Sequence, residues 1–481
     1  MNFIFFMPDE LRAESVGCYG HPLAPTPNMD ALAAAGTRFD QCHVQHSVCT
    51  PSRCSLLTGW YPHVRGHRTL WHMLRPDEPN LFRYLKSAGY AVHWYGKNDT
   101  LSPESFADSV DVAERRGSGM FGSNPYSLDD PAYYSFLYEP YTGPLEEHSD
   151  YANVQAGIDF LQSKPEQPFC LYLPITSPHC PYSAPQPWHD LINPDDLPPL
   201  RPTNLPNRPD FHRLIRETRR LDQLDEAVLR KIQAVYLGMT GYVDWLLGRL
   251  LEALDASGLA EETAVFVFSD HGDWAGDYGL VEKWPSAAED VITRVPLIAR
   301  IPGGATGHAV AEPVELFDVM ATTLDLAGIT AQHTHFARSL APQLGGAAGD
   351  AERAVFCEGG YAPHEPNCFE GQPHRDQFAR NPEHIYYPKG QLQQTHPNSV
   401  CRDVMMRTAT HKLVHRPTGV GELYDLAADP LELRNLHGAV EYAEIQAALE
   451  RRLLDWTIQT ADVTPFGEDP RGHRKQENSE R

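Results

Sequence analysis

The sequence predicts an α/β protein, with a large and mostly parallel sheet sandwiched by helices and a smaller α+β subdomain at the C-terminal end. Continuous apolar runs at 2–7, 169–173 and 263–268 are typical of strands that are buried on both faces. Helical patterns alternate with these runs, as parallel strand pairing requires. After about residue 345 the composition changes, and short strand-like segments precede one long helical pattern.

The first part of the chain begins with a strand and continues with two short helices. The strand 2–7 ends at Asp9 and Glu10, so it delivers two acids at its carboxyl end. Open α/β sheets place their sites at that edge. Short helices are predicted at 29–35 and 81–88.

The middle of the chain carries the clearest helical pattern. A strand at 90–95 follows Gly89, and the region 181–210 is rich in Pro and Asn, which predicts a surface excursion. The segment 225–254 has leucines at helical spacing. One face of this helix would carry Leu246, Leu247, Leu250, Leu251 and Leu254.

Two further apolar runs follow this helix. The β-prone run 263–268 predicts a strand that ends just before Asp270 and His271. The second run, 295–301, predicts another strand of the same sheet. The alternation of strands and helices indicates helices on both faces of the sheet.

The composition change defines two predicted domains, 1–345 and 346–481. The second begins with the segment 359–400, which is rich in Pro, His, Asn and Gln and has little periodicity. A loop of this length is often functional, so it either shapes a pocket or mediates assembly into a homo-oligomer. Strand-like pieces at 404–407 and 412–415, followed by a helix at 441–460, predict a small α+β unit.

The composition excludes several classes of protein. The formal net charge of −24 disfavours nucleic acid and anionic membranes as partners. We find no run of about 18 apolar residues, so no membrane span is predicted. The first apolar run is short and no basic residue precedes it, which predicts a cytoplasmic protein without a signal peptide. The nine cysteines are odd in number and form no CxxC pair, which argues against a disulfide framework.

One segment points to nucleophilic chemistry. Residues 49–59 read CTPSRCSLLTG, which places Cys49 at a helix start and Arg53 four residues later. A helix N-terminus stabilises anions, and the guanidinium of Arg53 adds a fixed positive fork. Cys49 is therefore a candidate nucleophile above an anion site. The alternative is a capped helix with a buried cysteine.

Two acidic pairs point to a metal. Asp9 and Glu10 end one predicted strand, and Asp270 and His271 end another. Neighbouring strands of a parallel sheet can bring the four together. Carboxylates suit Ca²⁺ or Mg²⁺, while a histidine also admits Mn²⁺ or Zn²⁺. The alternative is that these side chains cap helices.

The motif that begins at Cys49 resembles the signature of the type I sulfatases, formylglycine-dependent members of the alkaline-phosphatase superfamily. The resemblance extends from Asp9 to about Leu436 and implies an alkaline-phosphatase-like fold. It implies that a separate maturation enzyme oxidises Cys49 to formylglycine. One hydroxyl of the formylglycine hydrate would attack sulfur, and the other would then expel sulfate. Arg53 would hold this group in place.

The resemblance also implies a metal site and a set of substrate-binding residues. The metal would be Ca²⁺, held by Asp9, Glu10, Cys49, Asp270 and His271. The family more often has Asp-Asp where this chain has Asp9-Glu10. Lys97 and Lys283 would bind sulfate oxygens, and His179 or Lys283 would protonate the departing alcohol. Where the family often has Gly-Lys-x-His, this chain has Asp99 in place of the histidine.

Three functions compete on these grounds, and a transferase is a fourth alternative that no feature of the sequence favours. The first is a sulfatase that acts on a small-molecule or saccharide sulfate ester. The second is a phosphonate monoester or phosphodiester hydrolase of the same fold, which would use Mn²⁺. The third is a non-catalytic protein on the same scaffold, which would require loss of the nucleophile or of the metal acids. Because Cys49, Asp9 and Asp270 are all present, a catalytic sulfatase domain at 1–345 is favoured.

Overall fold

The computed structural model describes residues 1–463, and its centre is an eight-stranded sheet. β1 (Asn2–Asp9) pairs in parallel with β6 (Phe169–Pro178) and β7 (Thr263–Phe268), and β4 (Ala91–Tyr95) pairs in parallel with β6. The strand next to β7, β9, runs antiparallel to both of its neighbours. In spatial order the strands are β10 (His308–Val310), β2 (Thr37–Phe39), β9 (Leu297–Arg300), β7 (Thr263–Phe268), β1 (Asn2–Asp9), β6 (Phe169–Pro178), β4 (Ala91–Tyr95) and β5 (Val112–Glu114).

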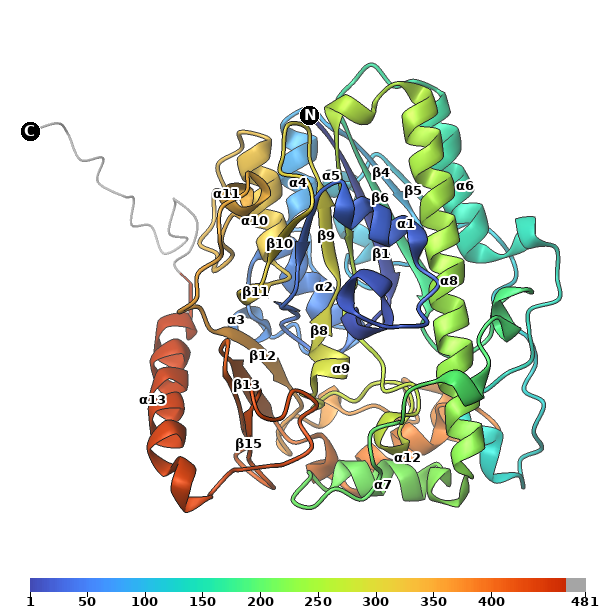
Figure 1. Ribbon diagram of the computed structural model, residues 1–481, viewed down its shortest axis with the longest axis vertical. Helices are drawn as coiled ribbons and strands as arrows, with labels where there is room; N and C mark the ends of the chain where they lie inside the picture. Colours follow the sequence, from blue (N-terminus) through green and yellow to red (C-terminus); the bar gives the residue numbers. More distant parts are fainter. Residues whose placement is uncertain (464–481) are drawn as a thin grey trace, which may run out of the picture.

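Helices cover both faces of this sheet (Figure 1). The longest of them, α8, runs beside the sheet for most of its height. The longer helices that pack on the sheet are α1 (Pro27–Ala34), α2 (Cys49–Thr58), α4 (Leu81–Ser87), α6 (Ser149–Gln162), α8 (Glu226–Ser257) and α10 (Asp318–Leu326). Other helices before the small subdomain are α3 (Pro62–Arg65), α5 (Phe106–Ser109), α7 (Phe211–Thr218), α9 (Asp290–Thr293) and α11 (Ala341–Leu344).

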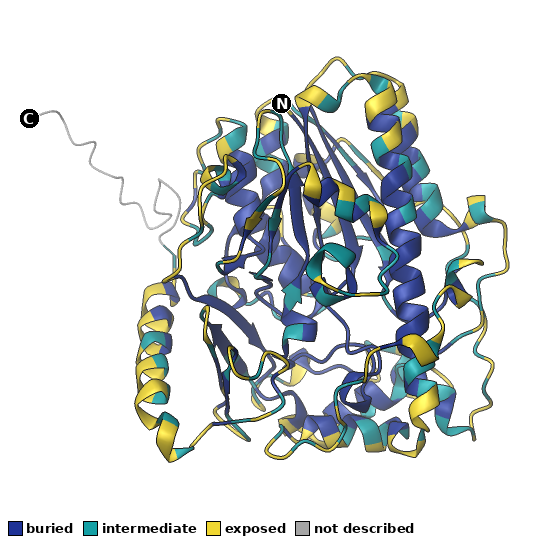
Figure 2. Cartoon of the chain, viewed as in Figure 1, coloured by how far each residue is buried: buried dark blue, intermediate teal, exposed yellow. Residues whose placement is uncertain are grey.

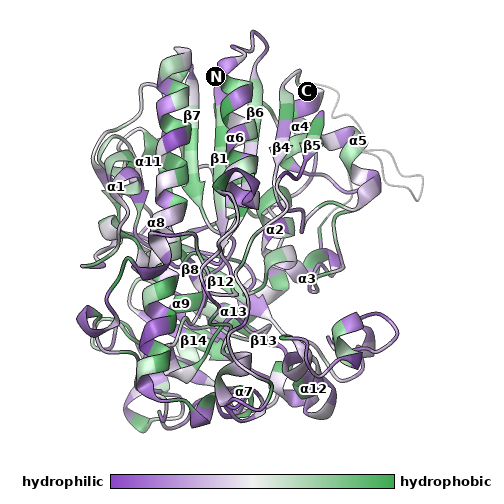
Figure 3. Cartoon of the chain, turned by 90° about the vertical axis from the view of Figure 1, so that its right-hand side faces the viewer, coloured by the Kyte–Doolittle hydropathy of each residue, from purple (hydrophilic) through white to green (hydrophobic). Residues whose placement is uncertain are grey.

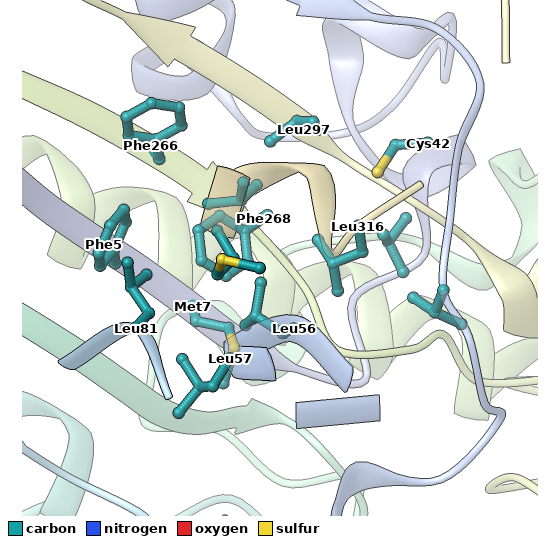
Figure 4. Close-up of a cluster of buried hydrophobic side chains, with 14 of the residues drawn as sticks. Phe5, Met7, Cys42, Leu56, Leu57, Leu81, Phe266, Phe268, Leu297 and Leu316 are labelled. Carbon is teal, nitrogen blue, oxygen red and sulfur yellow. The ribbon is translucent and has the colours of Figure 1, made fainter. Parts of the chain in front are cut away.

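The alternation of side chains along β1 explains why both faces are covered. Phe5 and Met7 belong to one core, which they share with α2, α4 and α10 (Figure 4). Ile4 and Phe6 belong to the opposite core, which they share with α1, α6 and α8. Successive side chains of a strand point to opposite faces, so a strand with a continuous apolar run needs a helical layer on each side. Figure 3 shows β1, β6 and β7 as largely hydrophobic.

The last quarter of the described chain forms the small subdomain. Its antiparallel sheet has the order β12-β13-β14-β15, and α13 covers it on the outside (Figure 1). The outward side of α13 is exposed, whereas the strands are buried (Figure 2). The bounds are β12 (Val355–Gly359), β13 (Asp403–Arg407), β14 (His411–His415), β15 (Glu422–Asp425) and α13 (Ala443–Thr460). A further small sheet joins β11 (Val314–Glu315), β3 (Cys42–His43) and β8 (Arg294–Val295).

The predicted fold class is confirmed, and the differences are local. The predicted strand 295–301 divides into β8 and β9, and β9 is antiparallel. The segment 359–400 is not devoid of structure, because it contains α12 (Tyr387–Thr395). The boundary at 345/346 stays a prediction, and residues 464–481 of the second predicted domain lie outside the described residues. None of the described helices is both long enough and apolar enough to cross a membrane.

Candidate active site

The candidate site lies where four parallel strands end. The strand order β7-β1-β6-β4 places the ends of these strands side by side at one edge of the sheet. β7 is followed by Asp270 and His271, β1 ends at Asp9, β6 leads to His179, and β4 leads to Lys97. Four predicted segments that are far apart in the sequence are therefore neighbours in space.

The turn that delivers Lys97 depends on Gly96. Its φ of +137° is unfavourable for residues with a side chain. A Cβ at this position would also lie 2.3 Å from the carbonyl oxygen of Pro174 in β6. Because only glycine meets both requirements without a rearrangement, the chain can turn tightly against β6 and direct Lys97 into the site.

Helix α2 supplies the candidate nucleophile at its first position. Cys49 is buried, and Ser52 in the first turn donates a hydrogen bond to the Asp270 carbonyl at 2.6 Å. Arg53 is fully buried and bridges two strand ends: its Nε donates to Asp270 Oδ2 at 2.7 Å, and its guanidinium lies 3.0 Å from Asp9 Oδ2. The motif thus fixes the start of α2 against the ends of β1 and β7.

Four of the predicted metal ligands come together. Asp9, Cys49, Asp270 and His271 each offer a ligand atom, and these atoms lie within 4.8 Å of one another. His271 donates through Nδ1 to the carbonyl oxygen of Gly272 at 2.9 Å, so the lone pair is on Nε2, which faces Cys49 Sγ at 3.1 Å. Two buried carboxylates beside an available imidazole nitrogen are a donor set that suits a divalent cation. The residues present therefore fit the implied metal.

Glu10 is not brought together with these four ligands. Its Oε1 lies 2.9 Å from Lys283 Nζ, and its Oε2 lies 3.4 Å from His179 Nδ1. Among the described residues it groups with His179 and Cys180 instead. The predicted five-ligand set is thus found as a set of four. The physical reason is that the longer side chain reaches the Lys283 ammonium and forms an ion pair with it.

Electrostatics keep Asp9 ionised and Cys49 neutral. Burial by itself would raise the pKa of Asp9, but Lys97 and Arg53 outweigh this effect and hold that pKa well below its usual value. Burial, together with the charge of Asp9, raises the pKa of the Cys49 thiol to about 12. An unmodified thiol here would be protonated at neutral pH and hence a poor nucleophile. This agrees with the prediction that Cys49 acts only after conversion to formylglycine.

Lys97 lies between three groups of the site. Its Nζ forms an ion pair with Asp9 and another with Asp99 Oδ2 at 2.8 Å, and it lies 3.9 Å from Cys49 Sγ. Asp99, the residue that replaces the histidine of the family pattern, therefore contacts the lysine directly. Where the family's histidine would stand, this chain has an acid that fixes the position of the ammonium.

Lys283 and His179 form a second pair of predicted residues that meet. The Lys283 ammonium donates to His179 Nε2 at 2.6 Å. Burial and the nearby ammonium groups of Lys283 and Lys97 lower the pKa of His179 well below its usual value, so its ring is neutral. Burial alone would lower the pKa of Lys283, but Cys49 and Glu10 raise it well above its usual value.

The comparison with known protein families decides the assignment. The family model described as Sulfatase matches residues 1–329 of this 481-residue chain. The match covers more than half of the chain and includes every predicted site residue. The chain belongs to the sulfatase family. The family implies a divalent metal and a formylglycine made from cysteine, and the prediction of a sulfuric ester hydrolase is confirmed at the level of the family.

Relatives and solved structures agree with this assignment. The sulfatase chain is 27% identical to the multifunctional alkaline phosphatase superfamily protein PehA of Trinickia caryophylli, covering 97% of this chain and 96% of that protein. It is 27% identical to the N-acetylglucosamine-6-O-sulfatase of Bacteroides thetaiotaomicron, covering 96% of this chain and 87% of the relative. The phosphonate monoester hydrolase of Agrobacterium radiobacter superposes with a TM-score of 0.75 at 22% identity, covering 95% and 96% of the two chains. The predicted alkaline-phosphatase-like fold is thus confirmed.

His46 is a further residue near the sulfatase site, and it was not predicted from the sequence. Its ring is fully buried, and Nδ1 accepts a hydrogen bond from the Val48 N–H at 3.1 Å. The hydrogen is therefore on Nε2, which has no hydrogen-bond partner among the described residues. The ring is close enough to His271 and Arg68 for their charges to influence it. Its position three residues before Cys49 is the only signal in the sequence that could have indicated it.

The segment 359–400 reaches the sulfatase site as well. Lys389 of α12 forms a buried ion pair with Glu282 at 2.8 Å, next to the predicted residue Lys283. The hydroxyl of Tyr386 lies 3.9 Å from Cys180 Sγ, beside His179. Because this segment has no periodic pattern, the residues that face the site could not be predicted from the sequence.

Proposed function

We propose that this sulfatase hydrolyses a sulfate ester of a saccharide or another small alcohol to the alcohol and inorganic sulfate. The observation that carries the proposal is the group formed by Asp9, Cys49, Asp270 and His271, whose ligand atoms lie within 4.8 Å of one another. The nucleophile position and the metal ligands thus share one buried site. The name of the Bacteroides relative, a carbohydrate sulfatase, supports a saccharide as the alcohol half.

The contacts of the site residues suggest a separate role for each of them. Asp9, Asp270, His271 and the side chain at position 49 would hold the metal, which when bound would neutralise ester oxygens and activate the nucleophile. Arg53 fixes Asp9 and Asp270 in their relative positions. Lys97 and Lys283 present ammonium groups near Cys49 for the sulfate oxygens.

The proton for the departing alcohol would come from the pair of Lys283 and His179. The two are joined by a hydrogen bond of 2.6 Å, so a proton can be shared between them. General acid catalysis by such a group typically contributes about 10²- to 10⁴-fold in rate. The maturation of Cys49 would require a separate formylglycine-generating enzyme, which is the one protein partner proposed here.

We propose Ca²⁺ as the metal, with Mn²⁺ as the alternative. Two carboxylates favour the harder cation, whereas the imidazole of His271 favours Mn²⁺. The choice is tested by elemental analysis of the matured protein. Stoichiometric calcium supports the first assignment, and stoichiometric manganese replaces it.

Phosphonate monoester hydrolysis is the second candidate. The structural similarity to the phosphonate monoester hydrolases of Agrobacterium radiobacter and Silicibacter pomeroyi favours it. The test is kcat/KM of the matured protein on 4-nitrophenyl sulfate and on 4-nitrophenyl phenylphosphonate, two substrates with the same leaving group. A higher value for the sulfate supports the proposal. A higher value for the phosphonate makes the second candidate the function.

A further inference from the structure

Glu10 occupies the position at which the early acidic pair of the family has its second acid. We infer that Glu10 is not a ligand of the metal but a positioning residue, which holds Lys283 and His179 beside the ester oxygen that leaves. The inference rests on the proposed function, because it assigns Glu10 to the leaving-group side of an ester hydrolase.

The carboxylate of Glu10 contacts Lys283 and His179. Both carboxylate oxygens are buried, one 2.9 Å from Lys283 Nζ and the other 3.4 Å from His179 Nδ1. Lys283 Nζ in turn donates to His179 Nε2 at 2.6 Å. The three side chains therefore form a closed triangle of contacts. The group of Asp9, Cys49, Asp270 and His271 does not include Glu10.

The backbone of Glu10 is held in the conformation that directs its side chain. Its φ is +67°, in the left-handed region that residues other than glycine rarely adopt. The Glu10 N–H donates to Asp270 Oδ1 at 3.2 Å, and the Tyr236 hydroxyl donates to the Glu10 carbonyl at 2.5 Å. These two buried bonds fix the peptide units on both sides, so the direction of the side chain is set by the fold.

The contacts with Glu10 and His179 orient the ammonium of Lys283. An ammonium has three N–H donors. The ammonium directs one of them to His179 Nε2 and lies 2.9 Å from Glu10 Oε1, so with these two neighbours in place a third N–H is left for a substrate oxygen. His179 donates through Nδ1 to the Cys180 carbonyl at 2.5 Å, so its Nε2 is the acceptor for Lys283. Without Glu10, the buried Lys283 ammonium would lose the acidic group beside it, and with that group part of its orientation.

Three variants of the matured full-length protein test the inference: Glu10→Asp, Glu10→Gln and Asp9→Asn. Two quantities are measured for each variant. The first is the metal bound per chain after dialysis, by elemental analysis. The second is kcat/KM over a series of aryl sulfates whose leaving phenols range from acidic 4-nitrophenol to weakly acidic phenols. Thermal melting of each variant establishes that it is folded.

The expected result separates the two acids. Asp9→Asn loses the metal, whereas both Glu10 variants keep it. In both Glu10 variants, kcat/KM falls about 10-fold or more further for the poorest leaving group than for 4-nitrophenyl sulfate, because only the poor leaving group needs the positioned proton donor. A residue that serves only the fold would lower all substrates equally.

Glu10→Asp is the decisive variant, because aspartate is the acid that the family more often has here and is too short to keep the contact with Lys283. If Glu10 is a metal ligand, Glu10→Asp keeps both metal and full activity while Glu10→Gln loses the metal, and the inference is overturned. An equal loss across the series also overturns it. If wild type prefers phosphonates, the sulfatase proposal fails, and the same leaving-group series run with aryl phosphonates still decides the role of Glu10.

Discussion

At the scale of single residues, Arg53 connects the nucleophile helix with two strand ends. Its guanidinium contacts Asp9 at 3.0 Å and Asp270 at 2.7 Å, and all three side chains are fully buried. Without this cation, the two carboxylates would repel each other at such a short separation. The planar fork of arginine can contact both at once, which the single ammonium of lysine cannot reproduce.

The variant Arg53→Lys is expected to lower kcat/KM by at least about 100-fold, because breaking a buried, bridging ion pair costs about 3–5 kcal/mol. The metal content should fall with the activity, since the relative position of Asp9 and Asp270 is lost. Steady-state kinetics and elemental analysis measure the two effects. The control is Arg213→Lys, at an arginine whose side chain is 55% exposed. Equal activity of Arg53→Lys and wild type would contradict the assigned role.

His67 gives the protein a pH-dependent contribution to stability. Its two ring nitrogens face the His72 carbonyl at 2.6 Å and the Glu78 carboxylate at 3.1 Å, so both can donate only when the ring is charged. Burial by itself would lower the pKa of His67, but Cys54 and Glu78 raise it to about 10. Because the pKa of His67 is higher in the folded protein than in the unfolded chain, protonation of the ring stabilises the fold. This contribution is complete below the unfolded-state pKa of about 6.5, and it is lost as the pH rises toward 10.

The corresponding test compares the melting temperatures of wild type and His67→Gln between pH 6 and pH 10. The difference should be largest near pH 6 and should shrink steadily above pH 7. His374→Gln, at an exposed histidine, serves as the control and should show no such trend. A difference that is constant over this range would show that His67 is neutral in the folded protein.

Part of the site could be predicted from single residues. The segment 49–59 is a continuous motif, so Cys49 and Arg53 could be recognised directly from the sequence. The side chain of Glu10 could not be placed, because its direction depends on a left-handed φ and on contacts with residues more than 160 positions away, such as His179 and Lys283. For His46 the limit was similar, since the absence of a partner for Nε2 among residues 1–463 is a property of the packed fold.

At the scale of elements, the buried strands were the most predictable feature. The continuous apolar runs predicted the bounds of β1 and β7 to within a few residues, because a strand that is buried on both faces is apolar at nearly every position. The direction of β9 could not be predicted, since parallel and antiparallel strands of a buried sheet have the same composition. Helix α6 was missed, because its polar and apolar residues give only a weak periodic pattern.

Helix α8 contains a glycine, Gly238, whose replacement by alanine should destabilise the protein, although this substitution usually stabilises a helix. Alanine favours a helix over glycine by about 1 kcal/mol. At Gly238, however, an added Cβ would lie 2.0 Å from the carbonyl oxygen of Trp188. Gly238→Ala is therefore expected to destabilise the protein, measured as the free energy of unfolding in urea. The exposed α8 position Glu252→Ala should be nearly neutral. A more stable Gly238→Ala variant would contradict the close packing of α8 against the backbone at Trp188.

At the scale of the whole molecule, the C-terminal part of the chain completes the site that the sheet begins. Trp284 Nε1, next to Lys283, donates to the Ser399 carbonyl at 2.6 Å, and Lys389 pairs with Glu282 on the other side. The segment 359–400 is therefore packed against the loop that carries Lys283. This favours the first of its two predicted roles, shaping the pocket, over assembly into an oligomer.

Removal of the metal should lower the stability of the whole protein without unfolding it. Asp9 and Asp270 already have cationic partners in Arg53 and Lys97, so the fold does not depend on the metal alone. A ligand present at 100 times its Kd stabilises the folded state by about 2.7 kcal/mol. A chelator should therefore lower the melting temperature of wild type, and added Ca²⁺ should restore it. Asp9→Asn should not respond, and an unresponsive wild type would contradict the metal site.

The central claim is that Cys49 acts as formylglycine, and mass spectrometry of the tryptic peptide 39–53 from protein made in its native host tests it most directly. The peptide also contains Cys42, so fragmentation must assign the change to position 49. The account predicts a mass about 18 Da below that of the thiol form, located at residue 49, as expected for an aldehyde in place of the thiol group. An unmodified Cys49 in a catalytically active preparation would contradict it.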